Sequence, residues 1–170
     1  MRLFIAIDAE SGEVNKIKKE FDLPGLKLTN NNHVTLKFLG EVDEKTLEEV
    51  KIRLKKIKFK QFNIRISGAG CFPNENYVKV VWVGIESDDL AALQKDIHKS
   101  LADIFPDERE FVPHLTLARV KFVKDEILLK EKLKTKFSEE TVRINNFKLI
   151  KSELQKNGPV YTVLETYNAE

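Results

Sequence analysis

The amino-acid sequence predicts an α+β fold in which two lobes repeat the order β-α-β-α-β. Two observations predict it. Segments with strand-like and helix-like apolar periodicity alternate along the chain, and the order found in residues 1–75 starts again in residues 76–170. A repeat of this length that occurs only twice is not a solenoid, and 170 residues suit a single duplicated domain. We therefore expect one bilobal domain over residues 1–170, with the sheets of its lobes facing a central groove.

The first repeat contains three predicted strands and two predicted helices. Ser11 and Asp43 are residue types that cap helices, and each precedes apolar residues at helical spacing. Pro24-Gly25 breaks the chain after the first helix, and the glycine-containing segment 68–74 predicts turns after the third strand. The expected elements are a buried strand over 2–8, a helix over about 11–21, a strand over 33–39, a helix after Asp43 and a strand over 62–66.

The second repeat follows the same order and adds a hairpin. Its elements are a strand over 77–85, a helix from Ser87 or Asp88 to Pro106, a strand over 114–122, a helix over about 125–137, a strand from Val142, and a hairpin of 147–154 and 160–167. The spacing supports a duplication. His33 precedes the strand start at Phe62 by 29 residues, and His114 precedes Val142 by 28 residues, by subtraction of their numbers.

Composition excludes several classes of protein. With 42% hydrophobic and 33% charged residues the chain is not a disordered tail, and a net charge of +2 is too small for a protein that coats duplex nucleic acid. The single cysteine, Cys71, excludes an intrachain disulfide and a cysteine-based zinc site. No membrane span and no export signal are visible and Cys71 is free, so we expect a cytoplasmic location without membrane contact. We also expect a monomer. The Lys/Arg-rich stretch 51–60 predicts the solvated face of a helix or, alternatively, a contact for a polyanion.

Two of the three histidines open the same four-residue pattern, His33-Val34-Thr35-Leu36 and His114-Leu115-Thr116-Leu117. On a strand, residues i and i+2 point to the same face, so each histidine shares a face with its threonine while the apolar residues face the core. The two patterns lie on equivalent strands of the two repeats. We therefore expect both His-Thr pairs to converge on the groove between the lobes.

The residue types in this pair suit proton transfer at a small anion. Imidazole titrates near neutral pH, so one histidine can act as general base while the other acts as general acid. Threonine hydroxyls can donate hydrogen bonds to phosphate oxygens. The alternatives are a polar residue satisfied at each strand end, or a metal site, for which no third-ligand cluster of Cys, His, Asp or Glu is visible. His98 lies beside the apolar stripe of its helix and is expected at the surface.

The ordered set of motifs resembles the two-histidine (2H) phosphoesterase superfamily, and within it the RNA 2',3'-cyclic phosphodiesterase (2'-5' RNA ligase) family. The segments that carry the resemblance are Met1–Ile7, His33–Gly40, Phe72–Asn74, Phe111–Arg119 and Gly158–Tyr161. The resemblance covers essentially the whole chain. It implies a bilobal fold, hydrolysis of a terminal RNA 2',3'-cyclic phosphate to a 2'-phosphate without metal or other cofactor, and a reversible 2'-5' ligation.

The resemblance also implies roles for single residues. His33 and His114 are the acid–base pair, with a slight preference for His114 as base, and Thr35 and Thr116 hold the phosphate. Arg119 matches an arginine that contacts phosphate or RNA. Because Arg119 is five residues after the second histidine, an ideal strand would turn it to the opposite face, and a bulge, twist or strand end is needed to bring it back.

Three further residues are candidates for substrate binding. Lys37 shares the His33 face of an ideal strand and could meet phosphate, or it could be solvated at a strand end. Phe72 and Tyr161 could stack on a base at the groove mouth, although packing in the core is the commoner reason for such aromatic residues.

The expected partner is an RNA end or a nucleotide that carries a 2',3'-cyclic phosphate. Two alternatives remain open at this stage. The same chemistry could act on a small cyclic nucleotide derivative or on a 2'-5' oligonucleotide. A non-catalytic protein that binds RNA ends is the other class, although binding alone does not need two titrating groups.

Overall fold

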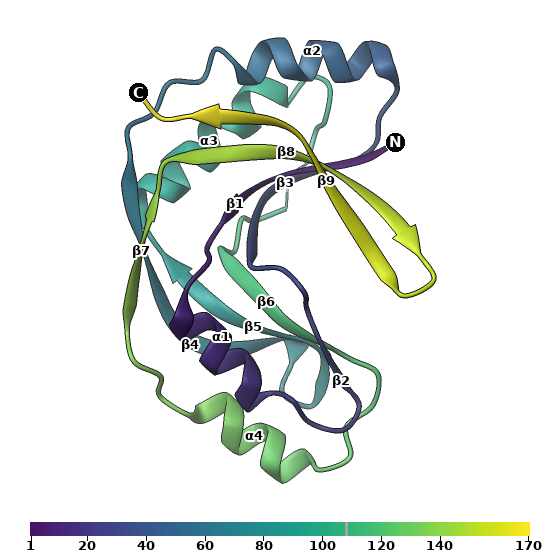
Figure 1. Ribbon diagram of the computed structural model, residues 1–170, viewed down its shortest axis with the longest axis vertical. Coiled ribbons are helices and arrows are strands. Elements are labelled where there is room, and N and C mark those ends of the chain that lie inside the picture. The colour runs from purple at the N-terminus through teal and green to yellow at the C-terminus, as the bar shows by residue number, and fades with distance from the viewer. Residues whose placement is uncertain (108) are drawn as a thin grey trace.

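A curled antiparallel sheet forms the centre of the computed structural model, which describes residues 1–107 and 109–170 (Figure 1). Its strands are β1 (Arg2–Asp8), β2 (Leu26–Leu28), β3 (His33–Glu41), β4 (Phe62–Asn74), β5 (Tyr77–Glu86), β6 (His114–Val120), β7 (Glu140–Ile144), β8 (Asn146–Gln155) and β9 (Gly158–Asn168). The order across the sheet is β7-β4-β5-β6-β3-β1-β8-β9, and β2 pairs with β6. The antiparallel sheet with its separate helices confirms the predicted α+β class.

The two repeats exchange strands. β1 pairs with β3 and with β8, so one half of the sheet combines strands from both ends of the chain. β5 pairs with β4 and with β6, so the last strand of the first repeat lies in the other half. The halves meet where Val34 of β3 pairs with Leu115 of β6. Each half of this continuous sheet therefore contains residues from both 1–75 and 76–170.

Within residues 1–107 and 109–170, four helices flank the sheet, and each begins after a residue whose side chain caps it. They are α1 (Gly12–Glu20), α2 (Glu44–Leu54), α3 (Asp88–Leu101) and α4 (Glu126–Lys134). The side chains of Ser11, Asp43, Ser87 and Asp125 each accept a hydrogen bond from the backbone N–H three residues further on. Figure 1 shows α2 and α3 at one end of the molecule and α1 and α4 at the other.

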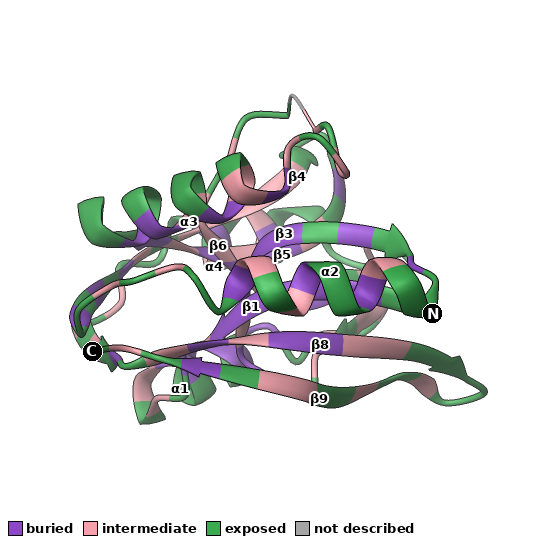
Figure 2. Cartoon of the chain, turned by 90° about the horizontal axis from the view of Figure 1, so that it is seen from above, coloured by how far each residue is buried: buried purple, intermediate pink, exposed green. Residues whose placement is uncertain are grey.

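The core lies between the helices and one face of the sheet. Leu3, Ile5 and Ile7 alternate along β1 and join the same buried cluster as the apolar stripes of the helices. In Figure 2 the buried side of α3 is turned toward the strands and its other side is exposed. The opposite face of β1 carries Phe4 and Ala6, which belong to a separate small cluster. The second face of the sheet is therefore free for a site.

Several boundaries differ from the sequence prediction. Segment 68–74 is not a turn, because β4 continues through it to Asn74 and pairs with β5. Its glycine at position 70 serves close packing instead, since a Cβ there would lie 2.3 Å from the Trp82 ring. β2 was not predicted. The predicted strand 114–122 ends at Val120, and the predicted helix 125–137 ends at Lys134.

The basic residues between positions 51 and 60 are largely neutralised by neighbouring carboxylates. The ion pairs are Lys51–Glu48, Arg53–Glu49, Arg53–Asp103, Lys55–Glu165 and Lys58–Glu170. Side chains that are already paired at the protein surface are poor contacts for a polyanion. The structure thus favours the interpretation of this stretch as the solvated face of a helix.

Candidate active site

The seam between β3 and β6 brings the two His-Thr motifs together. Val34 pairs with Leu115, so the antiparallel register sets His33 opposite Thr116 and Thr35 opposite His114. These four side chains point away from the face that buries Val34 and Leu115. Directly opposed residues in such a pair have Cβ atoms about 5 Å apart. By this register the four groups form a compact polar cluster on one face of the sheet.

Both motifs carry the same irregularity three residues after the histidine. In β6, Ala118 pairs with Val81 but Thr116 pairs with Trp82, so Leu117 is an extra residue in its strand. Leu117 and Ala118 are both fully buried, which breaks the strict alternation. Thr29 stabilises this bulge, because its hydroxyl donates to the Thr116 carbonyl at 2.9 Å and its N–H donates to the Leu117 carbonyl at 2.9 Å.

This bulge returns Arg119 to the face of His114 and Thr116. One extra residue shifts every later side chain to the other side of the strand. Arg119 is exposed, as expected for a residue on the open face. The irregularity that the sequence analysis required for Arg119 is therefore present at Leu117.

The equivalent bulge in β3 has the opposite consequence for Lys37. Ile5 pairs with Lys37 but Ala6 pairs with Thr35, so Leu36 is the extra residue. Lys37 consequently turns to the core side and is 5% exposed, while Phe38 takes the open face at 59% exposure. The expectation that Lys37 shares the face of His33 is wrong, because it assumed strict alternation.

Lys37 nevertheless borders a cavity of about 260 Å³ that Thr35 and His114 also line. Its ammonium lies 3.2 Å from Nδ1 of His98. Burial lowers the pKa of Lys37, Asp107 opposes that change, and Arg109 adds to it. His98 was expected at the surface. The structure places it half-buried against Lys37.

His33 lies in a polar and aromatic setting built by β1, β8 and β9. Its Nε2 is 3.2 Å from the Asp8 carboxylate, and the other oxygen of Asp8 contacts the ammonium of Lys148. Hydrogen bonding from His33 is the main reason that the pKa of Asp8 falls to about 2, and Lys148 adds to it against the effect of burial. The Tyr161 ring meets the His33 ring edge-on with centroids 5.5 Å apart.

His114 has a different setting. Its Nδ1 lies 2.7 Å from the carbonyl oxygen of Val112. A carbonyl can only accept, so Nδ1 carries the proton and a neutral His114 presents the Nε2 lone pair. Phe72 meets the imidazole edge-on at 5.0 Å, and the Trp82 ring lies 6.2 Å away. The Trp82 indole N–H is buried and has no partner among the described residues.

Comparisons with known proteins show the family of the chain. A family model described as the 2'-5' RNA ligase superfamily matches residues 7–156. The chain belongs to the 2'-5' RNA ligase superfamily. It is 38% identical to the RNA 2',3'-cyclic phosphodiesterase of Methanocaldococcus jannaschii, covering 98% of this chain and 100% of that protein. The similarity to the protein of the same name from Archaeoglobus fulgidus is 35%, covering 98% and 99%.

A solved structure shows the same fold. The crystal structure of TT0787 from Thermus thermophilus matches with a TM-score of 0.83 and 26% identity, covering 99% of this chain and 97% of that one. Membership confirms the 2H phosphoesterase resemblance seen in the motifs and places the chain among phosphodiesterase enzymes.

The structure brings each of the two aromatic candidates next to one of the two histidines. Tyr161 contacts His33 and Phe72 contacts His114, so each histidine has one aromatic neighbour from the predicted set. Neither residue belongs to the main core cluster, although Tyr161 packs on the small cluster around Phe4. Their location suits contact with a substrate, and stacking on a base stays a prediction.

The sequence analysis missed three residues of the site. Asp8 of β1 contacts His33, Lys148 of β8 contacts Asp8, and Trp82 lies opposite Thr116. A signal existed for Asp8, since it is an acid that ends a strand of apolar residues. Lys148 and Trp82 come from strands whose pairing the local sequence does not reveal.

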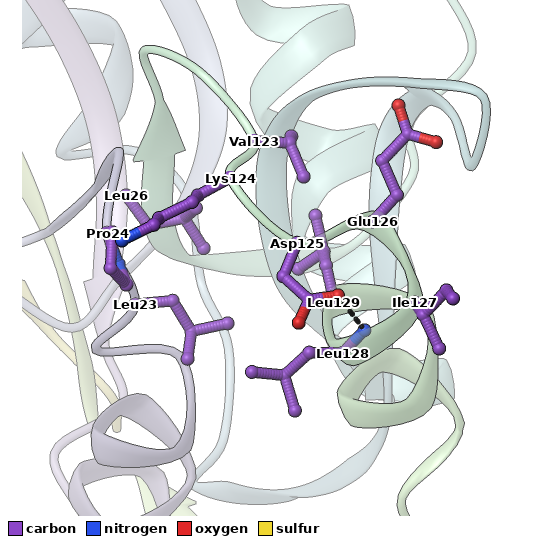
Figure 3. Close-up of a pocket in the computed structure, with 10 residues that line it drawn as sticks. All are labelled: Leu23, Pro24, Leu26, Val123, Lys124, Asp125, Glu126, Ile127, Leu128 and Leu129. Carbon is purple, nitrogen blue, oxygen red and sulfur yellow. Dashed lines mark hydrogen bonds between the residues drawn. The ribbon is translucent and has the colours of Figure 1, made fainter.

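A larger cavity of about 560 Å³ lies elsewhere and contains none of the predicted site residues (Figure 3). It is lined mainly by apolar side chains of the segment around Pro24 and of the start of α4, with Asp125 bonded to its own helix. No three His, Cys, Asp or Glu side chains gather as metal ligands within residues 1–107 and 109–170. None of the helices in that same part of the chain has the length and apolar character needed to cross a membrane.

Proposed function

We propose that this protein hydrolyses the terminal 2',3'-cyclic phosphate of RNA to a 2'-phosphate by acid–base catalysis between His33 and His114. The observation that carries the proposal is the register at the seam, where each histidine faces the threonine of the other motif. Two proton-transfer groups and two hydroxyl donors then surround one point. That set supplies everything that attack on a cyclic phosphodiester requires, so no metal or other cofactor is needed.

In the reaction, a water molecule attacks phosphorus while Nε2 of His114 takes one of its protons. The new P–O bond forms as the bond from phosphorus to O3' breaks, and His33 in its imidazolium form gives a proton to O3'. The product has a 2'-phosphate and a free 3'-hydroxyl. His114 is the base because its Nδ1–H is held by the Val112 carbonyl, which leaves the Nε2 lone pair available.

Thr35, Thr116 and Arg119 stabilise the charge that develops during this step. The two hydroxyls can donate to the non-bridging oxygens, and Arg119 shares their face because of the bulge at Leu117. Donors aimed at charge that grows in a transition state commonly contribute about 10²–10³-fold in rate each. Lys37 adds positive charge at the border of the adjoining cavity.

The relatives support RNA as the substrate class. The curated proteins that match over nearly the whole chain are named RNA 2',3'-cyclic phosphodiesterases, and the matching family is described as 2'-5' RNA ligases. Ligation is the same step with an RNA 5'-hydroxyl in place of water as the nucleophile: it attacks phosphorus, the bond from phosphorus to O3' breaks, and a 2'-5' phosphodiester forms. A protein that contacts only the end of an RNA neutralises few phosphates, and a net charge of only +2 is sufficient for that.

The test is a substrate panel in the presence of EDTA. An oligonucleotide ending in a 2',3'-cyclic phosphate should be converted to the 2'-phosphate, with a bell-shaped pH dependence. A 2',3'-cyclic mononucleotide and a 2'-5' oligonucleotide form the other arms, and preference for either would replace the RNA-end assignment with that substrate. Binding of the cyclic end without turnover would identify a non-catalytic RNA-end-binding protein and contradict the proposal.

Two further expectations stay predictions. A monomer would elute at the mass of one chain in light scattering coupled to size-exclusion chromatography. A cytoplasmic location is checked by fractionating cells that express the protein at its natural level.

A further inference from the structure

The two histidines of the site are equivalent in sequence pattern but differ in their cross-strand neighbours. In the register of β1 with β3, His33 faces Asp8. In the register of β5 with β6, His114 faces Gly84. The near-symmetric motifs therefore acquire a carboxylate on one side and no side chain on the other. An asymmetry of this kind can decide which histidine holds a proton.

Asp8 is held between two partners. Its Oδ1 lies 3.2 Å from His33 Nε2, and its Oδ2 contacts the ammonium of Lys148. β1 lies between β3 and β8 in the sheet, and Lys148 pairs with Ala6, two residues before Asp8 on the same face. The side chain of His33 is 17% exposed and that of Asp8 is 36% exposed, so the contact is partly sheltered from water.

We infer that Asp8, anchored by Lys148, is the positioning residue that makes His33 the general acid. The inference rests on the proposed function and deepens it. Asp8 accepts one N–H of the imidazolium and compensates its charge, while the second N–H remains to be given to O3'. Lys148 fixes the position of the carboxylate. Its positive charge also opposes the positive charge of protonated His33, so the imidazolium can still release its proton.

The charged groups around His33 agree with this assignment. Asp8 faces it from β1, Lys148 acts through Asp8 from β8, the neutral Tyr161 ring lies against it from β9, and Thr116 and His114 stand across the seam on β6. The Asp8 carboxyl, with its pKa lowered to about 2, stays ionised throughout the neutral range. Among these neighbours, Asp8 is the one negative group.

The test compares pH–rate profiles of wild type, Asp8→Asn and Lys148→Met on a cyclic-phosphate-terminated oligonucleotide. Loss of the carboxylate should move the alkaline limb of kcat/KM, which reports the acid, about one pH unit lower and reduce the rate at pH 8 about tenfold. Loss of the cation should move the same limb to higher pH by several tenths of a unit. Asp103→Asn, which removes a carboxylate paired with Arg53 on the helical surface, should leave both limbs in place.

Opposite shifts from two variants of one ion pair are not expected from a merely structural role. Unchanged limbs in Asp8→Asn, or shifts of both variants in the same direction, overturn the inference. If Asp8→Asn does not fold, Lys148→Met carries the decision alone, and an unshifted or lowered limb contradicts the inference. NMR titration of the His33 ring gives a readout independent of turnover. An inactive wild type would refute the proposed function, whereas an active wild type with unshifted variants would refute only the role of Asp8.

Discussion

Substituting Gly70 by alanine should disturb the active site by displacing the Trp82 ring. Gly70 of β4 pairs with Trp82 of β5, and the indole ring lies directly over it. An added Cβ would lie 2.3 Å from Cη2, 2.5 Å from Cζ2 and 2.8 Å from Cζ3 of that ring. Carbon atoms pack at about 3.5–4.0 Å, so the ring must move by about 1 Å. Phe72 and His114 both contact the Trp82 ring and must move with it.

The size of the effect follows from overpacking. Inserting a methyl group into a well-packed contact costs about 1–3 kcal/mol. For a chain of this length, about 2 kcal/mol lowers the Tm by about 4–8 °C. Displacement of a catalytic group by about 1 Å can reduce turnover up to about 10²-fold, so we expect kcat/KM to fall at least about tenfold. Thermal unfolding, the emission of the single tryptophan and steady-state kinetics measure the three effects.

Gly68→Ala is the matched control, because a Cβ at position 68 meets nothing within 4 Å. It changes the same residue type in the same strand and should leave Tm, emission and kcat/KM at wild-type values or raise the Tm slightly. Equal behaviour of the two alanine variants would refute the reasoning, since it would mean that the Trp82 ring does not depend on Gly70.

Three further predictions concern the site. Thr35→Val and Thr116→Val should each lower kcat about 10²-fold while KM changes less, and steady-state kinetics with equal effects on kcat and KM would argue against charge stabilisation. Arg119→Gln should raise KM for the oligonucleotide more than it lowers kcat, and an unchanged KM would place Arg119 away from the substrate. The pKa of Asp8 is lowered in the folded state, so its contribution to stability is present above about pH 4 and lost as the pH falls toward about 2. Since the carboxylate is 36% exposed, we expect about 1 kcal/mol, and chemical denaturation at pH 6 and pH 3 should show a smaller loss for Asp8→Asn than for wild type.

The sequence was sufficient for the parts of the fold that depend on local chemistry. Ser11, Asp43 and Ser87 cap helices because their side chains satisfy the free N–H groups of the first turn, which is a local property. That His33 and His114 share one site could be predicted, because the duplicated His-x-Thr pattern repeats the same residue types on equivalent strands. Near-symmetry in the sequence thus predicted a shared site without any knowledge of the sheet.

The role assigned to Arg119 called for an irregularity in its strand, but the positions of the two bulges could not be predicted, because they depend on which strand lies alongside. The extra residue at Leu117 arises within the pairing of β6 with β5, and Thr29 from another part of the chain stabilises it. The matching bulge at Leu36 turns Lys37 inward, where strict alternation would place it outward. A one-residue change in register inverts the prediction for every later side chain.

The exchange of strands between the repeats was equally hidden. Segment 68–74 has the composition of turns, yet Gly70 packs against the Trp82 ring and the backbone of the segment pairs with β5. Lys148 comes to Asp8 because β8 crosses to the first half of the sheet. Sequence periodicity describes each strand separately, whereas these features depend on tertiary pairing.

The central claim is that His33 and His114 act together on one cyclic phosphate. The most direct measurement is single-turnover hydrolysis of a cyclic-phosphate-terminated oligonucleotide by wild type, His33→Ala, His114→Ala and the double variant, with folding checked by circular dichroism. We predict that each single variant loses about 10²–10⁴-fold in rate, and that the double variant loses less than the product of the two because the pair acts as a unit. Wild-type rates in either single variant would contradict the account.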